Sequence, residues 1–459
     1  MGKKRRSQLL LELPFSSEPP VFTSAAVGLP RIMRRPAASF TMDITILDSA
    51  DARLLRAGVT VAHRVVDGLG EWYLAAPGWE PHLPAERIEP LGATGDLPDE
   101  FGRLIRPIVR RGVIGTLAAL HCERDEWALR TSEGTVAAIV RDDRVTVRRS
   151  GMTTARYREV TITASQPLTG QQRDFLASAA LSVNATIVDE FPTLRQRIGA
   201  PATGLTGFPA RGPLHRDASL EEFVTWVFTK HLGEITRADL RRRGGDPNDC
   251  AEVTDRVWAF GRDLRGLASV LEPSWREETE RLLAGLPFTT AGEADGTVLD
   301  VIESLVLAVR APRLGNLSQK PAAQVLFERA EQATMILADR CRTLEANAAD
   351  DKWAGALRAA EHLELVATVA EPLFAKPLRK LLRQLGEVVD DLRAADGATS
   401  LPEFDGLSAA QAFQLGQESE RKRALVAKAR RDFIHEWPER VVEARKQLKK
   451  AAKKIRATA

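Results

Sequence analysis

The sequence predicts an α+β fold, in which an N-terminal antiparallel β domain precedes a C-terminal all-α domain. Between about residues 42 and 190, short apolar segments alternate with polar residues at a period of two, as in residues 41–46 and 157–162, and turn-like glycine stretches separate them. After residue 218, Ala, Leu, Arg and Glu dominate, and these residues favour helices. Short strands with little helix between them indicate an antiparallel sheet or barrel, and the second half indicates a bundle of helices.

Two further segments complete this organisation. A helix is predicted at residues 169–187, where Phe175, Leu176, Ala179 and Leu181 recur at helical spacing. Residues 198–213 contain glycines and prolines in quick succession, which is typical of a linker. We therefore predict a β domain at residues 1–197, a linker at 198–217 and a helical domain at 218–459.

One helix can be predicted in detail, at residues 252–271. It carries an apolar stripe with spacings of three and four residues, which must face the core; its members are Val253, Val257, Phe260, Leu264, Leu267 and Leu271. A second stripe on the opposite side contains Asp255, Trp258, Arg262 and Arg265. The arginines fit a solvated face, whereas the large ring of Trp258 is expected to pack against another helix or a neighbouring domain.

Length and composition restrict the class of protein. At 459 residues the chain has room for two or three domains. No apolar run reaches the ~18 to 20 residues that a membrane span needs, so a membrane protein is excluded. Three scattered cysteines and the absence of a secretory signal pattern predict a reducing, cytoplasmic location.

Positive charge is concentrated at the C-terminus. The net charge is +3, but residues 421–459 contain 14 Lys or Arg and four acidic residues, a local charge of +10. Lys446, Lys449, Lys450, Lys453 and Lys454 share helical faces there. Such a segment can attract a polyanion, or it can be an ordinary solvated helix face.

The helical half resembles the CHAD family, whose members are associated with inorganic polyphosphate. The similarity lies in residues 253–273 and 356–391, and in Trp437. The resemblance implies an anion-binding site, for which this chain keeps Arg262, Arg265, Arg358 and His362. Acidic or apolar residues occupy other positions of the pattern; these are Asp255, Trp258, Glu361 and Glu364.

The first half resembles the CYTH family of triphosphate tunnel enzymes, through residues 51–64, 72–77, 120–124 and 137–145. The resemblance implies an eight-stranded antiparallel barrel with a charged tunnel that holds a metal ion and a triphosphate. Of the family's metal-binding carboxylate patterns, this chain keeps only Glu12 and Glu159, which are too few oxygens for Mg²⁺. Arg64, Arg87 and Arg124 form a possible residual anion site, although solvent-facing strand arginines would look the same.

Other motifs that carry chemistry are absent from the sequence. His215, His231 and His435 have no partner at metal-ligand spacing, and there is no glycine-rich phosphate loop or nucleophile elbow. We therefore predict no catalytic residue, metal site or cofactor.

Three functions remain open. The first is a non-catalytic or weakly active CYTH-CHAD protein that binds polyphosphate or another polyanion. The second is a divergent metal-dependent triphosphatase that uses Glu12, Glu89 and Glu159. The third is a helical scaffold that binds a protein partner, with Trp258 and Trp353 on an exposed apolar patch.

Overall fold

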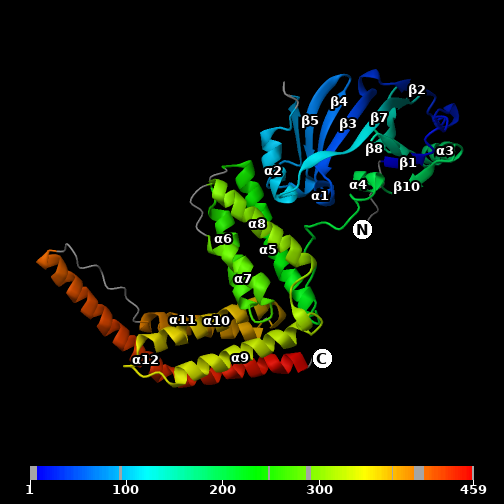
Figure 1. Ribbon diagram of the computed structural model, residues 1–459. Helices are drawn as coiled ribbons and strands as arrows, with labels where there is room; N and C mark the ends of the chain where they lie inside the picture. Colours follow the sequence, from blue (N-terminus) through cyan, green and yellow to red (C-terminus); the bar gives the residue numbers. More distant parts are fainter. Residues whose placement is uncertain are drawn as a thin grey trace. The chain divides into compact units, whose positions relative to one another are not determined.

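The computed structural model describes residues 8–91, 96–246, 249–285, 291–374, 376–396 and 408–456 (Figure 1). The chain divides into two compact units. The first unit comprises Met1–Gly207 with Arg243–Gly245, and the second comprises Phe208–Arg242 with Asp246–Ala459.

In the described part of the first unit, ten strands form one antiparallel sheet in the order β10-β1-β9-β8-β7-β3-β4-β5-β6, with β2 paired to β7. The strands are β1 (Gln8–Leu13), β2 (Arg31–Arg34), β3 (Phe40–Ser49), β4 (Thr60–Val66), β5 (Leu69–Ala75), β6 (Glu86–Pro90), β7 (Ile114–Arg130), β8 (Val136–Arg149), β9 (Met152–Ala164) and β10 (Thr186–Val188). The helices of this unit are α1 (Arg53–Arg56), α2 (Asp99–Val109), α3 (Gly170–Leu181) and α4 (Leu194–Ile198), with 3-10 turns at Ala25–Val27, Pro36–Ala38 and Pro77–Trp79.

The sheet is not closed into a barrel, which corrects the expectation drawn from the CYTH resemblance. Among the described residues, the edge strands β6 and β10 each pair with one neighbour only. Closure needs two edges with matching rows of free backbone groups. Strand β10 has three residues, and β6 has five and ends at Pro90, which has no N–H to donate. The antiparallel sheet itself agrees with the sequence prediction.

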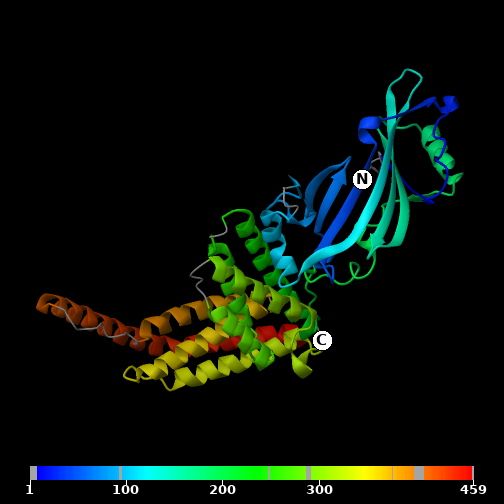
Figure 2. The same ribbon diagram turned by 45° about the horizontal axis from the view of Figure 1, so that its top comes forward.

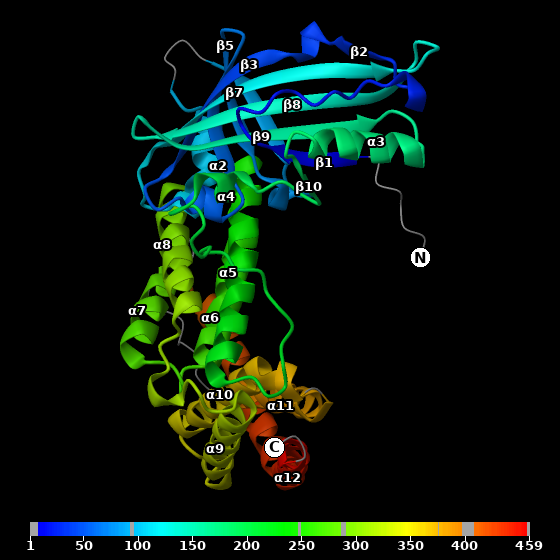
Figure 3. The ribbon, with the colours of Figure 1, turned by 90° about the vertical axis from the view of Figure 1, so that its right-hand side faces the viewer.

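Residues of the long strands alternate between two apolar clusters, one on each face of the sheet. Along β9, Val160 and Ile162 belong to a cluster that Leu176 of α3 completes, and Figure 3 shows α3 beside β1 and β9. Tyr157 points to the opposite face, where Ile198 and Ala202 complete the second cluster. This period of two is the physical basis of the strand prediction.

Helix α3 is shorter than predicted. A capping box between Thr169 and Gln172 fixes its start. It ends at Leu181, and Asn184 adopts a left-handed backbone with φ of 62°. The predicted last turn is instead β10, which pairs with β1.

The second unit consists of helices around one apolar core. They are α5 (Leu220–Gly244), α6 (Ala251–Gly266), α7 (Pro273–Ala284), α8 (Ala291–Arg310), α9 (Ala322–Arg342), α10 (Asp350–Phe374), α11 (Lys376–Ala395) and α12 (Ala409–Arg456), with a 3-10 turn at Gly315–Leu317. All six side chains of the predicted apolar stripe are buried in this core, but the helix is shorter than predicted: α6 ends at Gly266, so Leu267 and Leu271 lie in the turn that follows it. Among the described helices, none combines the length and the apolarity that crossing a bilayer requires.

Helix α12 is the longest helix, with 48 residues. Figure 2 shows its first part standing away from the other helices, whereas its later part lies along α9 and α11. In the later part, Phe433 contacts the buried ring of Trp353 with a centroid distance of 5.8 Å and stacks on Trp437 at 5.6 Å. These rings anchor α12 to the core.

Both ends of the predicted linker are anchored by contacts within the unit to which each belongs. In the first unit, Arg56 Nε donates to the carbonyl of Pro201 at 2.9 Å, and Ala202 is fully buried. In the second unit, Trp226 Nε1 donates to the carbonyl of Gly212 at 3.1 Å, and Arg211 lies over the Trp226 ring.

Candidate functional site

Three carboxylates form a row on one face of the sheet. Glu12 on β1 is the register partner of Glu159 on β9, and Glu159 is the partner of Asp143 on β8. Register partners on neighbouring strands point to the same face. The next strand, β7, adds Arg124 directly opposite Asp143.

Arginines pair with the carboxylates of this row. Arg197 on α4 donates to both Glu12 and Glu159, with a distance of 2.8 Å to Glu159 Oε1. Arg124 forms a fork with Asp143, at 2.6 and 3.0 Å. Each carboxylate of the row therefore has a cationic partner.

Burial has the largest effect on the pKa of Glu159. Desolvation raises its pKa above the usual range, Asp143 and Glu12 raise it further, and the bond from Arg197 opposes them. The described residues contain no group of three or more His, Cys, Asp or Glu side chains that could hold a metal ion. The row is thus a set of ion pairs, with acids and bases engaging each other.

The three predicted barrel arginines are not brought together. Arg64 pairs with Glu71 at 2.6 Å and lies over the Tyr73 ring. Arg87 pairs with Glu100 of α2. In the register of β5 and β6, Arg87 lies opposite Leu74 and therefore on the other face from Tyr73.

Glu89 does not join the carboxylate row either. It is the register partner of Trp72, one position from Ile88, which is the partner of Tyr73. It therefore lies on the opposite face from Tyr73, with Arg87.

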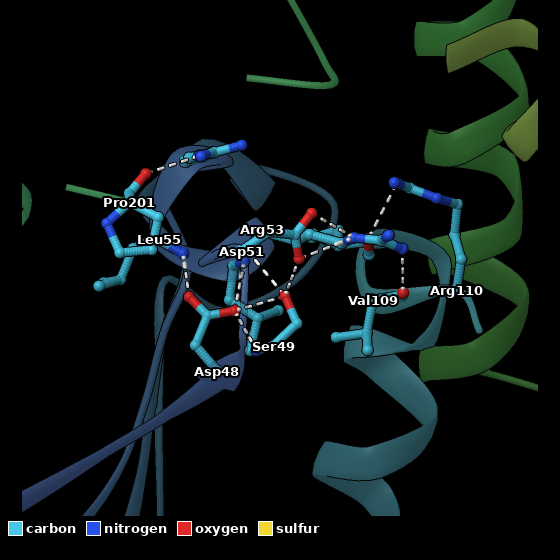
Figure 4. Close-up of polar contacts among 11 residues, drawn as sticks. Asp48, Ser49, Asp51, Arg53, Leu55, Val109, Arg110 and Pro201 are labelled. Carbon is cyan, nitrogen blue, oxygen red and sulfur yellow. Dashed lines mark hydrogen bonds and ion pairs between the residues drawn. The ribbon is translucent and has the colours of Figure 1, made fainter. Parts of the chain in front are cut away.

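The segment that resembles the CYTH turn has a structural role, which Figure 4 shows. The buried carboxylate of Asp48 accepts hydrogen bonds from the backbone N–H groups of Ser49, Leu54 and Leu55, at 2.7, 2.9 and 2.9 Å. Arg53 binds Asp51 and the carbonyl of Val109, which ties α1 to the end of α2. Burial raises the pKa of Asp48, although its backbone hydrogen bonds act in the opposite direction.

In the second unit, a groove of about 770 Å³ lies between α6 and α7. Its lining includes Trp258, Arg262 and Arg265 from α6, together with Asp255, and Glu280 from α7. Within the described part of the chain, neither arginine forms an ion pair with a carboxylate, and Arg265 donates only to the carbonyl of Gly261 in its own helix. These two cations are therefore available to a ligand.

Trp258 does not pack as predicted. Its side chain is 54% exposed at the groove, because the space between α6 and α7 is open to solvent there. Trp353, in contrast, is fully buried in the core. The exposed patch of both tryptophans that the scaffold hypothesis requires does not form.

Arg358 and His362 both lie on the exposed side of α10, one helical turn apart. Partial desolvation lowers the pKa of His362 below its ordinary value. The predicted repulsive residue Glu361 is engaged by Arg393 at 3.1 Å.

No local pattern in the sequence indicates the role of Arg197 or the pairing of His231 with Asp263. His231 is fully buried, and its Nε2 lies 2.6 Å from Asp263 Oδ2. Both relationships join residues far apart in the chain, so no local spacing indicates them. Only the strand order and the helix packing bring the partners together.

No protein-family profile and no curated protein matches the chain. Similar solved structures include a candidate adenylate cyclase from Bacillus halodurans, with a TM-score of 0.23 and 11% identity over 35% of this chain and 84% of the other. A candidate adenylate cyclase from Vibrio parahaemolyticus has a TM-score of 0.21 and 11% identity over 42% and 97% of the two chains. A candidate adenylyl cyclase from Hippeastrum with a dominant triphosphatase activity has a TM-score of 0.22 and 12% identity over 41% and 91%. Similarity at this level carries no argument about the function of this chain.

Proposed function

We propose that this chain binds inorganic polyphosphate, or another phosphate-rich anion, in the groove between α6 and α7, and that it does not hydrolyse its ligand. The observation that carries the proposal is the state of Arg262 and Arg265. Both are exposed in the groove and free of carboxylate partners within the described residues, whereas Arg64, Arg87 and Arg124 are all paired. An arginine already bound to a carboxylate must give up that bond before it can bind a phosphate.

The charge of the groove sets the expected strength of binding. Asp255 and Glu280 also line it and repel an anion, although Glu280 lies 3.8 Å from Arg276. Two arginines on successive turns of one helix can contact two neighbouring phosphates of a chain. We therefore expect weak binding that depends strongly on salt.

A second basic surface extends the proposal. Lys449, Lys450 and Lys453 are exposed near the end of α12, and Lys446 shares Glu443 with Lys380. Lys454 lies outside the described side chains. A long anion can gain affinity by contacting both surfaces, so affinity should rise with chain length.

The proposal is tested by isothermal titration calorimetry, in which long-chain polyphosphate is titrated into the full chain at low and at high ionic strength. We expect binding at low salt that the double substitution Arg262→Gln and Arg265→Gln weakens about tenfold or more. The matched control is Lys352→Gln with Arg383→Gln, which removes two exposed cations from other helices. An equal loss in both double variants, or no binding at low salt, would contradict a specific site in the groove.

The absence of hydrolysis is supported by the ion pairs of the sheet. The acids that a metal-dependent triphosphatase would need, Glu12 and Glu159, are bound by Arg197, and Glu89 faces the other side. A carboxylate bound to a guanidinium holds a metal only if that ion pair is broken.

A further inference from the structure

A second cavity in the helical unit is separate from the proposed anion groove. It has a volume of about 220 Å³ and lies between α9, α10, α11 and α12. Its apolar wall includes Leu337, Leu363, Leu385 and Val388, all buried, and the ring of Trp437. Apolar cavities of about 150 Å³ hold a benzene molecule, so this one has room for an aromatic ring and a short side chain.

One polar atom in the wall has no partner. The Oε1 atom of Gln384 on α11 is buried and accepts no hydrogen bond within the described part of the chain. A buried acceptor without a donor costs about 1–3 kcal/mol. A ligand that donates a hydrogen bond to this oxygen would recover part of that cost.

The charged residues of the cavity favour a positive ligand. Glu387 and Glu439 line it, and neither forms an ion pair within the described residues. The single arginine of the lining, Arg440, is already bound to Asp391 and Glu436. Glu443 also lines the cavity and is bound by Lys380 and Lys446. The unpaired charge of the described lining, that of Glu387 and Glu439, is therefore negative.

We propose that this cavity binds a small aromatic amine. The ring would lie against the apolar wall, and the ammonium group would donate to Gln384 Oε1 in the negative field of Glu387 and Glu439. Cavities between the helices of a bundle, apolar with a few polar groups, are a common type of small-molecule site. This site shares no residue with the anion groove and does not depend on it.

The proposal is tested with three probes of one size and different charge: 2-phenylethylamine, 2-phenylethanol and 3-phenylpropionate. Each is titrated into the full chain by isothermal calorimetry. We expect saturable one-to-one binding of the amine, weaker binding of the alcohol and no binding of the carboxylate. No saturable binding of the amine, or equal binding of all three, would overturn the proposal.

Variants locate the binding. Ala444→Leu places a larger side chain in the cavity from α12 and should weaken amine binding strongly, while Gln384→Leu should weaken it about fivefold through loss of the acceptor. Glu387→Gln with Glu439→Gln should weaken the amine about threefold and leave the alcohol unchanged. Circular dichroism establishes that each variant is folded. If a cavity variant does not fold, the double change of the surface residues Glu387 and Glu439 still tests the site. Amine binding that is unchanged in the folded cavity variants and in this double variant would overturn the proposal.

Discussion

Arg197 donates a hydrogen bond to Glu159 across 2.8 Å, from a five-residue helix to the middle of a long strand. The same guanidinium binds Glu12 and lies 4.2 Å from the centroid of the Tyr157 ring. One side chain from the end of the first unit therefore bridges two facing carboxylates of the sheet. Without Arg197, the negative charges of Glu12 and Glu159 would repel each other with no cation between them.

We expect Arg197→Gln to destabilise the first unit by about 2 kcal/mol at neutral pH, because the substitution leaves two partly buried carboxylates without their cation. Hydrogen exchange of β1 and β9 in the full chain measures this local stability. The matched control is Arg195→Gln on the same helix, where the side chain is exposed and forms no ion pair within the described residues. Equal protection in wild type and Arg197→Gln would show that the bridge is unimportant.

The same variant should show a stronger pH dependence. The folded-state pKa of Glu159 is already raised above its ordinary 4.5, so the folded unit binds this proton more tightly than the unfolded chain. Stability therefore falls as pH rises above about 4.5, and it recovers on acidification. Loss of Arg197 raises this pKa further, so the difference between variant and wild type should shrink from pH 8 to pH 5. A difference that grows on acidification would contradict this sign.

Asp48 supports a further prediction. Its carboxylate holds the N–H groups of Leu54 and Leu55, so Asp48→Ala leaves buried donors without an acceptor. We expect a cost of about 2 kcal/mol and roughly 30-fold faster amide exchange at these two residues. The control is Asp51→Asn, whose half-exposed carboxylate binds mainly Arg53, and it should change exchange at Leu54 and Leu55 little.

The sequence predicts those parts of the fold that depend on local periodicity. Alternation indicated strands at residues 41–46 and 157–162, which lie in β3 and β9, and the spacing of Val253, Val257 and Phe260 indicated the buried face of α6. Whether the sheet closes depends on the length and the backbone groups of β6 and β10, which side-chain periodicity does not record. Helix α3 ends at Leu181, shortly before Asn184 adopts a left-handed backbone. The residue composition of this segment favours a helix and does not indicate that change of backbone conformation.

The candidate sites were less predictable, because charge pairing is a property of the folded chain. Arg124 and Asp143 lie 19 residues apart, and Arg197 and Glu12 lie 185 apart. From the sequence, Arg262 and Arg265 are the expected anion ligands, and Arg64, Arg87 and Arg124 are a possible residual site, but nothing in the sequence indicates which of the five are paired. Arg64 and Arg87 form ion pairs, whereas Arg262 and Arg265 form none within the described residues although Asp255 and Glu280 line the same groove. This difference depends on the packing of α6 and α7 and on the register of the sheet, which the sequence does not show.

The paired acids also predict the outcome of an activity assay. We expect no phosphate release above background when the chain is incubated with tripolyphosphate and Mg²⁺ or Mn²⁺. Release that Glu159→Ala abolishes and Glu133→Ala leaves intact would establish a divergent triphosphatase instead. Glu133 is a suitable control because it lies in the turn between β7 and β8, outside the carboxylate row.

The groove between α6 and α7 allows a change that strengthens binding. Asp255 lines it beside Trp258 and forms no ion pair within the part of the chain that the structure describes, so its charge opposes an anionic ligand. We expect Asp255→Asn to tighten polyphosphate binding about threefold at low salt, with a smaller gain at high salt because the effect is electrostatic. Binding in the groove should quench the fluorescence of the exposed Trp258, and the variant Trp258→Phe shows how much of the fluorescence change comes from this residue.

The matched control is Asp351→Asn on α10, which removes an exposed acid elsewhere in the same unit. An equal gain in both variants would mean that the ligand responds to net charge alone, whereas a gain confined to Asp255→Asn places the phosphate chain along Arg262 and Arg265.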